Sequence, residues 1–171
     1  MILCVIFTLF VGGVSAEDVT SDVDNAVLAD SIGSDLSQVN VAVDFEFSDD
    51  NKRYHTYNYF LRHKFGKKVF KVPLNVDLGC PNRDGTKGVG GCIFCSAKMS
   101  GDFAGNPWDD IATQFNEIKA KMHQKWSDGL YIPYFQAGSN TYADIETLRK
   151  MYYTALSFEN VAGLSIATRA D

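Results

Sequence analysis

Lysine and arginine are absent from the first fifty residues, which carry ten aspartates and glutamates. The rest of the chain holds all sixteen basic residues and the other eleven acidic ones, a net charge of +5, although the formal charge of the whole 171-residue chain is −5. A charge shift of this kind indicates two chemically different segments. We therefore place a boundary near Asn51 and treat residues 52–171 as the folded body of the chain.

A long apolar run is also lacking. Residues 1–16, MILCVIFTLFVGGVSA, form an apolar leader that is shorter than the roughly 20 residues needed to span a membrane. Its apolar stretch and final small residues are typical of a secretory signal peptide, but the usual preceding positive charge is missing, so a mis-assigned start is the alternative. Residues 17–51 are acidic and without periodicity, which predicts a disordered linker.

Cysteine is scarce and unevenly placed. Cys4 lies in the leader, and the body has only Cys80, Cys92 and Cys95, an odd number that does not suit a framework of paired disulfides. Three cysteines within sixteen residues favour a metal site in a reducing compartment. We therefore expect a cytoplasmic protein with no stable membrane association, in conflict with the secretory character of residues 1–16.

The body alternates between strand and helix patterns. Apolar alternation predicts strands at 69–76, 131–136 and 161–168, and helical spacing predicts helices from Asp109 to about Trp126 and from Thr141 onward. Thr141 followed by Asp144 indicates a capping box for the second helix. Its apolar side is expected to consist of Ile145, Leu148, Met151, Tyr152, Ala155 and Leu156.

Strand–helix–strand–helix–strand order implies parallel crossovers, and therefore an α/β fold. Three parallel strands alone would leave open sheet edges and a small core. We expect a partial, TIM-like (β/α) barrel, truncated to about three strands and two helices. No internal repeat is visible.

Between the first strand and first helix lies a loop, residues 77–106, that contains the run CPNRDGTKGVGGCIFC. Its glycines let the backbone curl closely around a bound group, and thiolates are the usual ligands of iron–sulfur clusters. A structural metal site normally fills all four ligand positions, whereas a reactive one keeps a position open. Three cysteines therefore fit a cluster with one exposed iron.

Two other kinds of site would also fit this pattern of cysteines. A zinc ion could be held by the three cysteines and one of His55, His63 or His123, although none of these has zinc-finger spacing. The pair Cys92 and Cys95 could be a thioredoxin-like dithiol, which leaves Cys80 without a role. Spacing alone leaves the cluster and the zinc site open.

The cysteine run resembles the signature of YhcC-type radical S-adenosylmethionine (SAM) proteins, relatives of the radical SAM domain of the Elongator catalytic subunit. The similarity extends through RYHTYNYFLRHKFGKKVFKVPLNVDLG before the run and YFQAGSNTYADIETLRKMYYTAL after it. The ending GLSIATRAD is similar to the third-strand segment of that family, where proline is usual at the position of Ala170. The resemblance covers residues 52–171 and implies the N-terminal part of a radical SAM domain.

The resemblance implies an enzyme that cleaves SAM to a 5′-deoxyadenosyl radical, with electrons from a reductant such as flavodoxin or ferredoxin. Cys80, Cys92 and Cys95 would bind a [4Fe–4S] cluster. The residues expected to contact SAM are Phe94 (adenine), Gln136, Ser139, Asn140 and Thr141 (amino group and carboxylate), and Arg169. The alternatives are a loop anchor for Phe94, a helix cap for Asn140 and Thr141, and pairing of Arg169 with Asp171.

Residues 52–71 carry seven lysines and arginines and no acidic residue, with aromatic residues between them. This composition can bind RNA phosphates and stack on bases, and the resemblance to Elongator implies tRNA as a candidate substrate. The alternative is a solvated face whose aromatic rings pack on the fold. For the whole chain, the other candidates are a non-enzymatic truncated or secreted fragment and a zinc-stabilised nucleic-acid-binding module.

Overall fold

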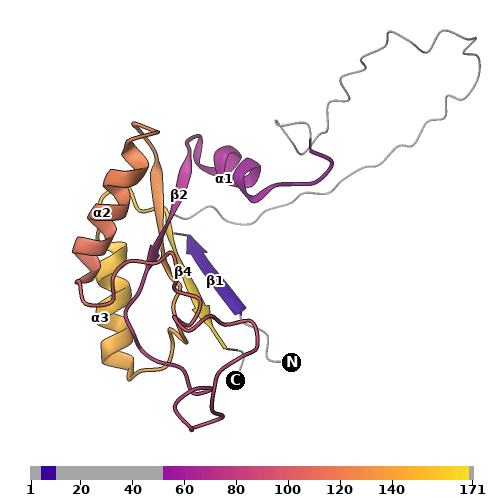
Figure 1. Ribbon diagram of the computed structural model, residues 1–171. Helices are drawn as coiled ribbons and strands as arrows, with labels where there is room; N and C mark the ends of the chain where they lie inside the picture. The colour runs from indigo at the N-terminus through magenta and orange to yellow at the C-terminus, as the bar shows by residue number, and fades with distance from the viewer. Residues whose placement is uncertain (1–4, 11–51, 170–171) are drawn as a thin grey trace, which may run out of the picture.

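The computed structural model describes residues 5–10 and 52–169 (Figure 1). The proposed cleavage site at residues 14–16, Cys4, the acidic linker and the last two residues lie outside the described residues. The fold is therefore discussed for the body of the chain and for one short strand near its start.

The fold is mixed α/β, as predicted, and is built on one sheet with the strand order β1-β4-β3-β2. Strands β2 (Val69–Leu74), β3 (Leu130–Phe135) and β4 (Gly163–Thr168) run parallel, with Leu74 opposite Phe135 and Phe135 opposite Ile166. Their carboxyl ends therefore lie at the same edge of the sheet. Figure 1 shows the cysteine loop at this edge.

Two helices cover one face of this sheet. Helix α2 (Ile111–His123) and helix α3 (Ile145–Leu156) pack side by side on the buried face of the three parallel strands (Figure 1). The main buried residues of this core are Phe70, Val72, Leu74, Phe115, Ile118, Tyr131, Phe135, Ala155, Leu164 and Ile166. The alternation of apolar residues along β2 and the helical spacing in α2 thus predict the buried positions correctly.

Helix α1 (Tyr57–Phe65) lies on the other face, beside the amino end of β2. Thr56 caps its start by accepting a hydrogen bond from the backbone N–H of Tyr59. Gly66 ends it in the left-handed conformation at φ 65°, where glycine avoids the steric cost that other residues meet. Aromatic and basic residues before Gly66 are compatible with a short helix or an irregular segment, and the structure has the helix.

The predicted capping box at Thr141 is wrong. Helix α3 is capped by Asp144, whose side chain accepts a hydrogen bond from the N–H of Thr147 at 3.0 Å. The Thr141 hydroxyl instead makes a hydrogen bond with the hydroxyl of Thr168, across the loop from the end of β4. Ile145, assigned to the apolar side, is 73% exposed, because it occupies the first position of the helix.

The remaining differences between the predicted and the observed helices and strands are at their ends. Helix α2 ends at His123, three residues before the predicted end at Trp126. The Trp126 ring instead packs on Phe70, with the ring centroids 5.4 Å apart. The observed strands also begin or end one or two residues from the predicted limits.

Strand β1 (Val5–Phe10) pairs antiparallel with β4, from Val5 opposite Thr168 to Phe10 opposite Gly163. These residues belong to the segment that we interpret above as an apolar leader. Pairing between residues more than 150 positions apart leaves no local signal in a sequence. Among the described helices, none combines the length and apolar character that crossing a membrane requires.

Replacing Phe135 with alanine should lower the free energy of unfolding by about 3–5 kcal/mol. Phe135 is fully buried in the core between the sheet and the helices, and its removal leaves a cavity. Chemical denaturation measures the change. Tyr153→Ala is the control, because Tyr153 on α3 is 66% exposed, and this variant should stay within about 0.5 kcal/mol of the wild type. Equal losses in the two variants would contradict the described core.

Candidate functional site

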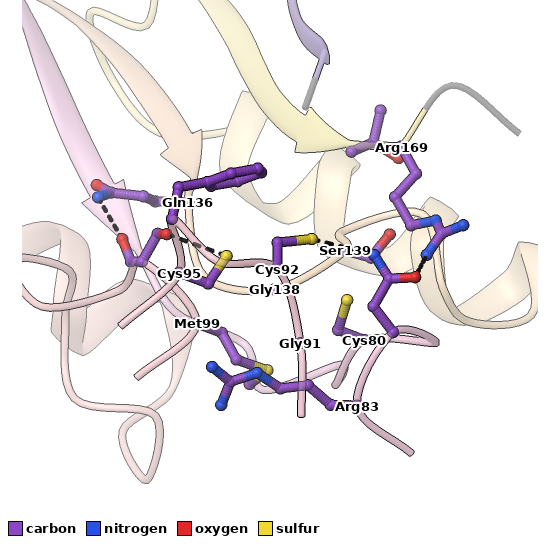
Figure 2. A pocket seen from close by; sticks show the side chains of 14 residues that line it. Cys80, Arg83, Gly91, Cys92, Cys95, Met99, Gln136, Gly138, Ser139 and Arg169 are labelled. Atoms are coloured by element: carbon purple, nitrogen blue, oxygen red, sulfur yellow. Dashed lines mark hydrogen bonds between the residues drawn. The ribbon is translucent and has the colours of Figure 1, made fainter. Parts of the chain in front are cut away.

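A hollow lies beyond the carboxyl ends of the parallel strands, and most of the predicted site residues line it (Figure 2). It is formed by the cysteine loop, the loop that follows β3, and the end of β4. The predicted residues in its wall are Cys80, Cys92, Phe94, Cys95, Gln136, Ser139 and Arg169. Asn140 and Thr141 are not in this wall.

The three cysteines are half-buried, and none of them is in a disulfide. Two of the sulfurs accept hydrogen bonds from side chains of the same loop. Asn82 Nδ2 donates to Cys92 Sγ at 3.2 Å, and Ser100 Oγ donates to Cys95 Sγ at 3.5 Å (Figure 2). Donors of this kind orient metal ligands and stabilise negative charge on sulfur.

Arg169 extends this hydrogen-bond network from the end of β4. Its Nη1 donates to Asn82 Oδ1, while the Nδ2 of the same amide donates to Cys92 (Figure 2). Because an amide oxygen only accepts and an amide nitrogen only donates, the two contacts together determine which way Asn82 points. Asp171, the alternative partner that we considered for Arg169, lies outside the described residues.

Arg83 stabilises the cysteine loop through hydrogen bonds within the loop. Its guanidinium donates to the carbonyl oxygens of Ala97 at 3.0 Å and Ser96 at 2.6 Å, just after the last cysteine. Gly91 lies against the Arg83 side chain, and a Cβ there would come within 2.6 Å of Arg83 Nε. A larger residue here would displace the Arg83 side chain from its hydrogen bonds, and the left-handed backbone, with φ +83°, itself favours glycine.

The loop after β3 holds the cysteine loop from the other side. Gly138 N–H donates to Met99 O at 3.1 Å, and Ser139 N–H donates to Gly79 O at 3.0 Å. A Cβ on Gly138 would come within 2.5 Å of Gly79 O, so only glycine permits this approach. The backbone on both sides of the three cysteines is thus fixed by two consecutive residues after β3.

Gln136 also contacts the cysteine loop. Its Nε2 donates to Ser100 O at 2.7 Å (Figure 2). Met99 and Ser100 both adopt positive φ angles, 52° and 65°, which is uncommon for residues other than glycine. Strained backbone of this type persists where the surroundings hold it, and it is concentrated at functional sites.

Asn140 lies behind the hollow. It is completely buried, and its Nδ2 donates to the carbonyl oxygens of Phe135 at 2.9 Å and Ala167 at 3.0 Å, which joins the ends of β3 and β4. Its Oδ1 is buried without a hydrogen-bond partner among the described atoms. The helix cap that we considered as the alternative for Asn140 and Thr141 is wrong, since Asp144 caps α3.

Within the described residues, no group of three or more His, Cys, Asp or Glu side chains is arranged to hold a single metal ion. The three histidines contact aromatic rings, and none of them lines the hollow. This finding gives no support to the zinc site considered above, and none to the cluster either. Ligands of one ion converge on a point, whereas a four-iron cluster binds each thiolate at a different iron, so its ligands are spread more widely.

The hollow is small and open on one side. Its cavity volume is about 60 Å³, far below the several hundred Å³ of most small-molecule sites. Phe94 is 59% exposed at its edge. The hollow formed by the described residues thus does not enclose a ligand of the size of SAM.

Three polar residues of this site were not singled out from the sequence. Asn82 and Arg83 are part of the cysteine run, and Ser100 follows it by five residues. Polar residues in a loop are common, so their positions carry no specific signal. Only the folded loop shows that Asn82 and Ser100 point at sulfur and that Arg83 points at backbone carbonyls.

Comparison with known proteins gives relatives without an established function. The chain is 58% identical over 127 residues to the uncharacterized protein YtqA of Bacillus subtilis, covering 74% of this chain and 39% of that protein. It is 38% identical over 114 residues to the protein YhcC of Escherichia coli, covering 65% of this chain and 35% of YhcC. The uncharacterized protein MJ0486 of Methanocaldococcus jannaschii is 35% identical over 117 residues.

The chain thus spans little more than a third of the length of these curated relatives. No protein-family model matches the sequence, and no solved structure matches it. These comparisons relate the chain to a group of longer proteins and assign no activity to them.

Replacing Gly138 with alanine should destabilise the cysteine loop. The new Cβ would be forced against Gly79 O, and overpacking of this kind costs about 1–3 kcal/mol. Gly90→Ala is the matched control, because Gly90 has a similar φ of +81° but open space around its Cβ position. We expect the free energy of unfolding to fall further for Gly138→Ala, and limited proteolysis to cut its cysteine loop faster. The same loss in both variants would leave only backbone strain as the cause.

Proposed function

We propose that this chain is the cluster-binding part of a cytoplasmic radical SAM enzyme of the YhcC type. The observation that carries the proposal is that Cys80, Cys92 and Cys95 line one hollow as free, half-buried thiols at the carboxyl ends of parallel strands. In (β/α) barrels, active sites are built at this end of the strands. The sequence similarity to YhcC over 65% of the chain supports the assignment to the YhcC type, while the radical SAM activity is what the resemblance of the cysteine run implies.

The donor set fits an iron–sulfur cluster. When bound to these three thiolates, a [4Fe–4S] cluster would supply the electron for the cleavage of SAM. The residues of this chain hold and orient the three sulfurs: Arg83 fixes the backbone after Cys95, while Asn82 and Ser100 donate hydrogen bonds to Cys92 and Cys95. Hydrogen bonds to sulfur are one of the means by which a protein adjusts the potential of such a site.

SAM would be bound by groups in the same wall. Gln136, Ser139 and Arg169 line it with polar atoms, and Phe94 offers an exposed ring at its edge. Asn140 would act indirectly, because its side chain joins β3 to β4 behind the hollow. Thr141 is bonded to Thr168 and lines a neighbouring hollow.

The fold that we propose for the longer relatives is a (β/α) barrel, of which β2, β3 and β4 would be the first three strands, and its next parallel strand would replace β1 at the edge of β4. Its remaining strands would close the open side of the hollow and exclude water from it. The relatives are long enough for this, since the chain matches only 35–39% of their length. A reductant such as flavodoxin or ferredoxin would be required as the electron donor.

Substitution of any one of the three body cysteines by serine should abolish cluster binding. We expect the wild-type chain, reconstituted without oxygen, to take up iron and sulfide, and Cys80→Ser, Cys92→Ser and Cys95→Ser to lose most of both. Iron and sulfide analysis and visible absorption measure the uptake. Cys4→Ser is the control and should retain it, because Cys4 lies outside the cysteine run.

Cleavage of SAM can be measured with the same preparations. With a strong reductant, the loaded wild type should convert SAM to 5′-deoxyadenosine, and a version extended to the length of YtqA should do so faster. Uptake of zinc with refusal of iron would reject the proposal, and so would full iron uptake by Cys80→Ser.

A tRNA substrate is the more specific part of the proposal, and it depends on residues 52–71. Several cations of this segment already have partners on the fold. Lys67 pairs with Asp128 at 2.9 Å, and Lys71 Nζ lies 4.6 Å from the ring centroid of Tyr134. These contacts support the alternative in which the segment packs on the sheet.

The position of the segment also limits how RNA could bind. Helix α1 precedes β2 and lies at the end of the sheet opposite the hollow. A strand of six residues is about 20 Å long. An RNA that touches both places must therefore extend along the whole strand.

If residues 52–71 contact phosphates, tRNA affinity should fall roughly tenfold or more between about 50 and 200 mM salt. The double variant Arg53→Ala/Lys64→Ala should bind more weakly and show a smaller salt slope. Arg149→Ala/Lys150→Ala removes the same charge from exposed positions on α3 and is the control. Filter binding across a salt series measures both slopes; affinity independent of salt would exclude phosphate contacts.

A further inference from the structure

A second hollow adjoins the cysteine hollow and shares Ser139 and Arg169 with it. Its cavity volume is about 240 Å³. The other polar residues in its wall are Thr86 and Lys87 of the cysteine loop and Thr141 and Tyr142 of the loop after β3. The second hollow thus lies between the two loops that form the cysteine hollow.

Two cations and several hydroxyl groups face this space. Lys87 is exposed on the cysteine loop, and Arg169 comes from the end of β4 on the opposite side. The Thr86 and Tyr142 hydroxyls lie 3.0 Å apart and both also hydrogen-bond to Asp84, whereas Ser139 and Thr141 line the same space. The donors therefore come from three separate segments and meet at one place.

One carboxylate lies close to this group. Asp84 does not line the hollow, but it accepts a hydrogen bond from the N–H of Thr86 at 2.8 Å. Hydrogen bonds from the backbone and side chain of Thr86 hold the pKa of Asp84 below its usual value, so the group is negative at neutral pH. Two positive charges against one negative charge leave the site with a net charge of +1.

We propose that this second hollow binds a phosphate group carried by the substrate. A phosphate presents three or more acceptor oxygens in different directions, which suits an ammonium, a guanidinium and hydroxyl donors placed around it. A carboxylate has two oxygens in one plane and would leave part of this donor set without a partner. The assignment of the phosphate to a substrate rests on the function proposed above.

The shared wall explains how such a group would position a substrate. Ser139 and Arg169 separate the two hollows, so a phosphate in the second places the atoms attached to it beside the cysteine hollow. Binding a part of the substrate away from its reacting atom holds that atom in place. The substrate class is accordingly a phosphorylated small molecule or a nucleic acid.

Phosphate binding can be measured on the chain as it is, without iron or SAM. Titration of the ¹⁵N-labelled protein with inorganic phosphate should shift the backbone amide signals of Thr86 and Tyr142. Lys87→Met should weaken this binding about tenfold, as expected when a charged donor is lost, and Lys87→Arg should restore most of it. Lys98→Met is the matched control, because Lys98 is an exposed lysine of the same loop that lines neither hollow.

Glycerol phosphate and a short oligoribonucleotide distinguish the source of the phosphate. Equal affinity for glycerol phosphate and the oligonucleotide, both dependent on Lys87, indicates a small phosphorylated substrate. Much tighter binding of the oligonucleotide with the same dependence indicates a nucleic acid. No shift at Thr86 and Tyr142, or equal losses in Lys87→Met and Lys98→Met, would overturn the proposal.

Iron uptake by the same proteins separates this inference from the proposed function. Lys87→Met should load iron and sulfide like the wild type, since Lys87 does not line the cysteine hollow. Failure of phosphate binding in a protein that loads iron rejects the second site and leaves the proposed function intact. Phosphate binding in a protein that refuses iron keeps the anion site but overturns its assignment to a radical substrate.

Discussion

The close approach of two loop backbones at Gly79 and Gly138 is the constraint on which the candidate site depends. Gly138 lies directly against Gly79 O, and the next residue, Ser139, donates its N–H to that same oxygen. This contact ties the start of the cysteine loop to the end of β3, in the rigid part of the sheet. Without it, the three thiols would belong to a long loop with little to hold them in one place.

The parallel sheet supplies the rest of the frame. Because β2, β3 and β4 all end at one edge, the cysteine loop, the loop after β3 and Arg169 meet there. Buried polar groups then lock these ends together: Asn140 joins β3 to β4, and Gln114 on α2 accepts from the Asn75 N–H and donates to Asn75 O just after β2. The site is thus held by hydrogen bonds at the rim of an apolar core.

Local patterns were enough to predict the parallel α/β arrangement and the gathering of the cysteines. The helical spacing of Ile111, Phe115 and Ile118 predicts a helix with one buried face, and the structure has that helix, which Asp110 caps. Longer-range contacts were not predictable in this way. Thr141 resembles a cap, but it bonds to Thr168, 27 residues away.

Long-range contacts also determine what residues of the candidate site do, and local patterns do not predict these contacts. Asn140 is a common type of ligand-binding residue and follows a strand, yet its side chain is used to join two strands because Phe135 O and Ala167 O both face it. Asn82 carried no signal, and it proves to lie between Arg169 and Cys92. In both cases the deciding partner comes from a distant part of the chain, where spacing gives no information.

The link from Arg169 through Asn82 to Cys92 makes the orientation of one amide depend on one cation. With a neutral side chain at position 169, nothing at that end would keep the Asn82 oxygen turned away from the sulfur. A half-turn about χ2 would then present an oxygen lone pair to the sulfur in place of an N–H, which would repel a thiolate instead of stabilising it. Arg169, the last described residue, therefore determines whether a hydrogen-bond donor or an acceptor faces Cys92, which lies 77 positions earlier in the sequence.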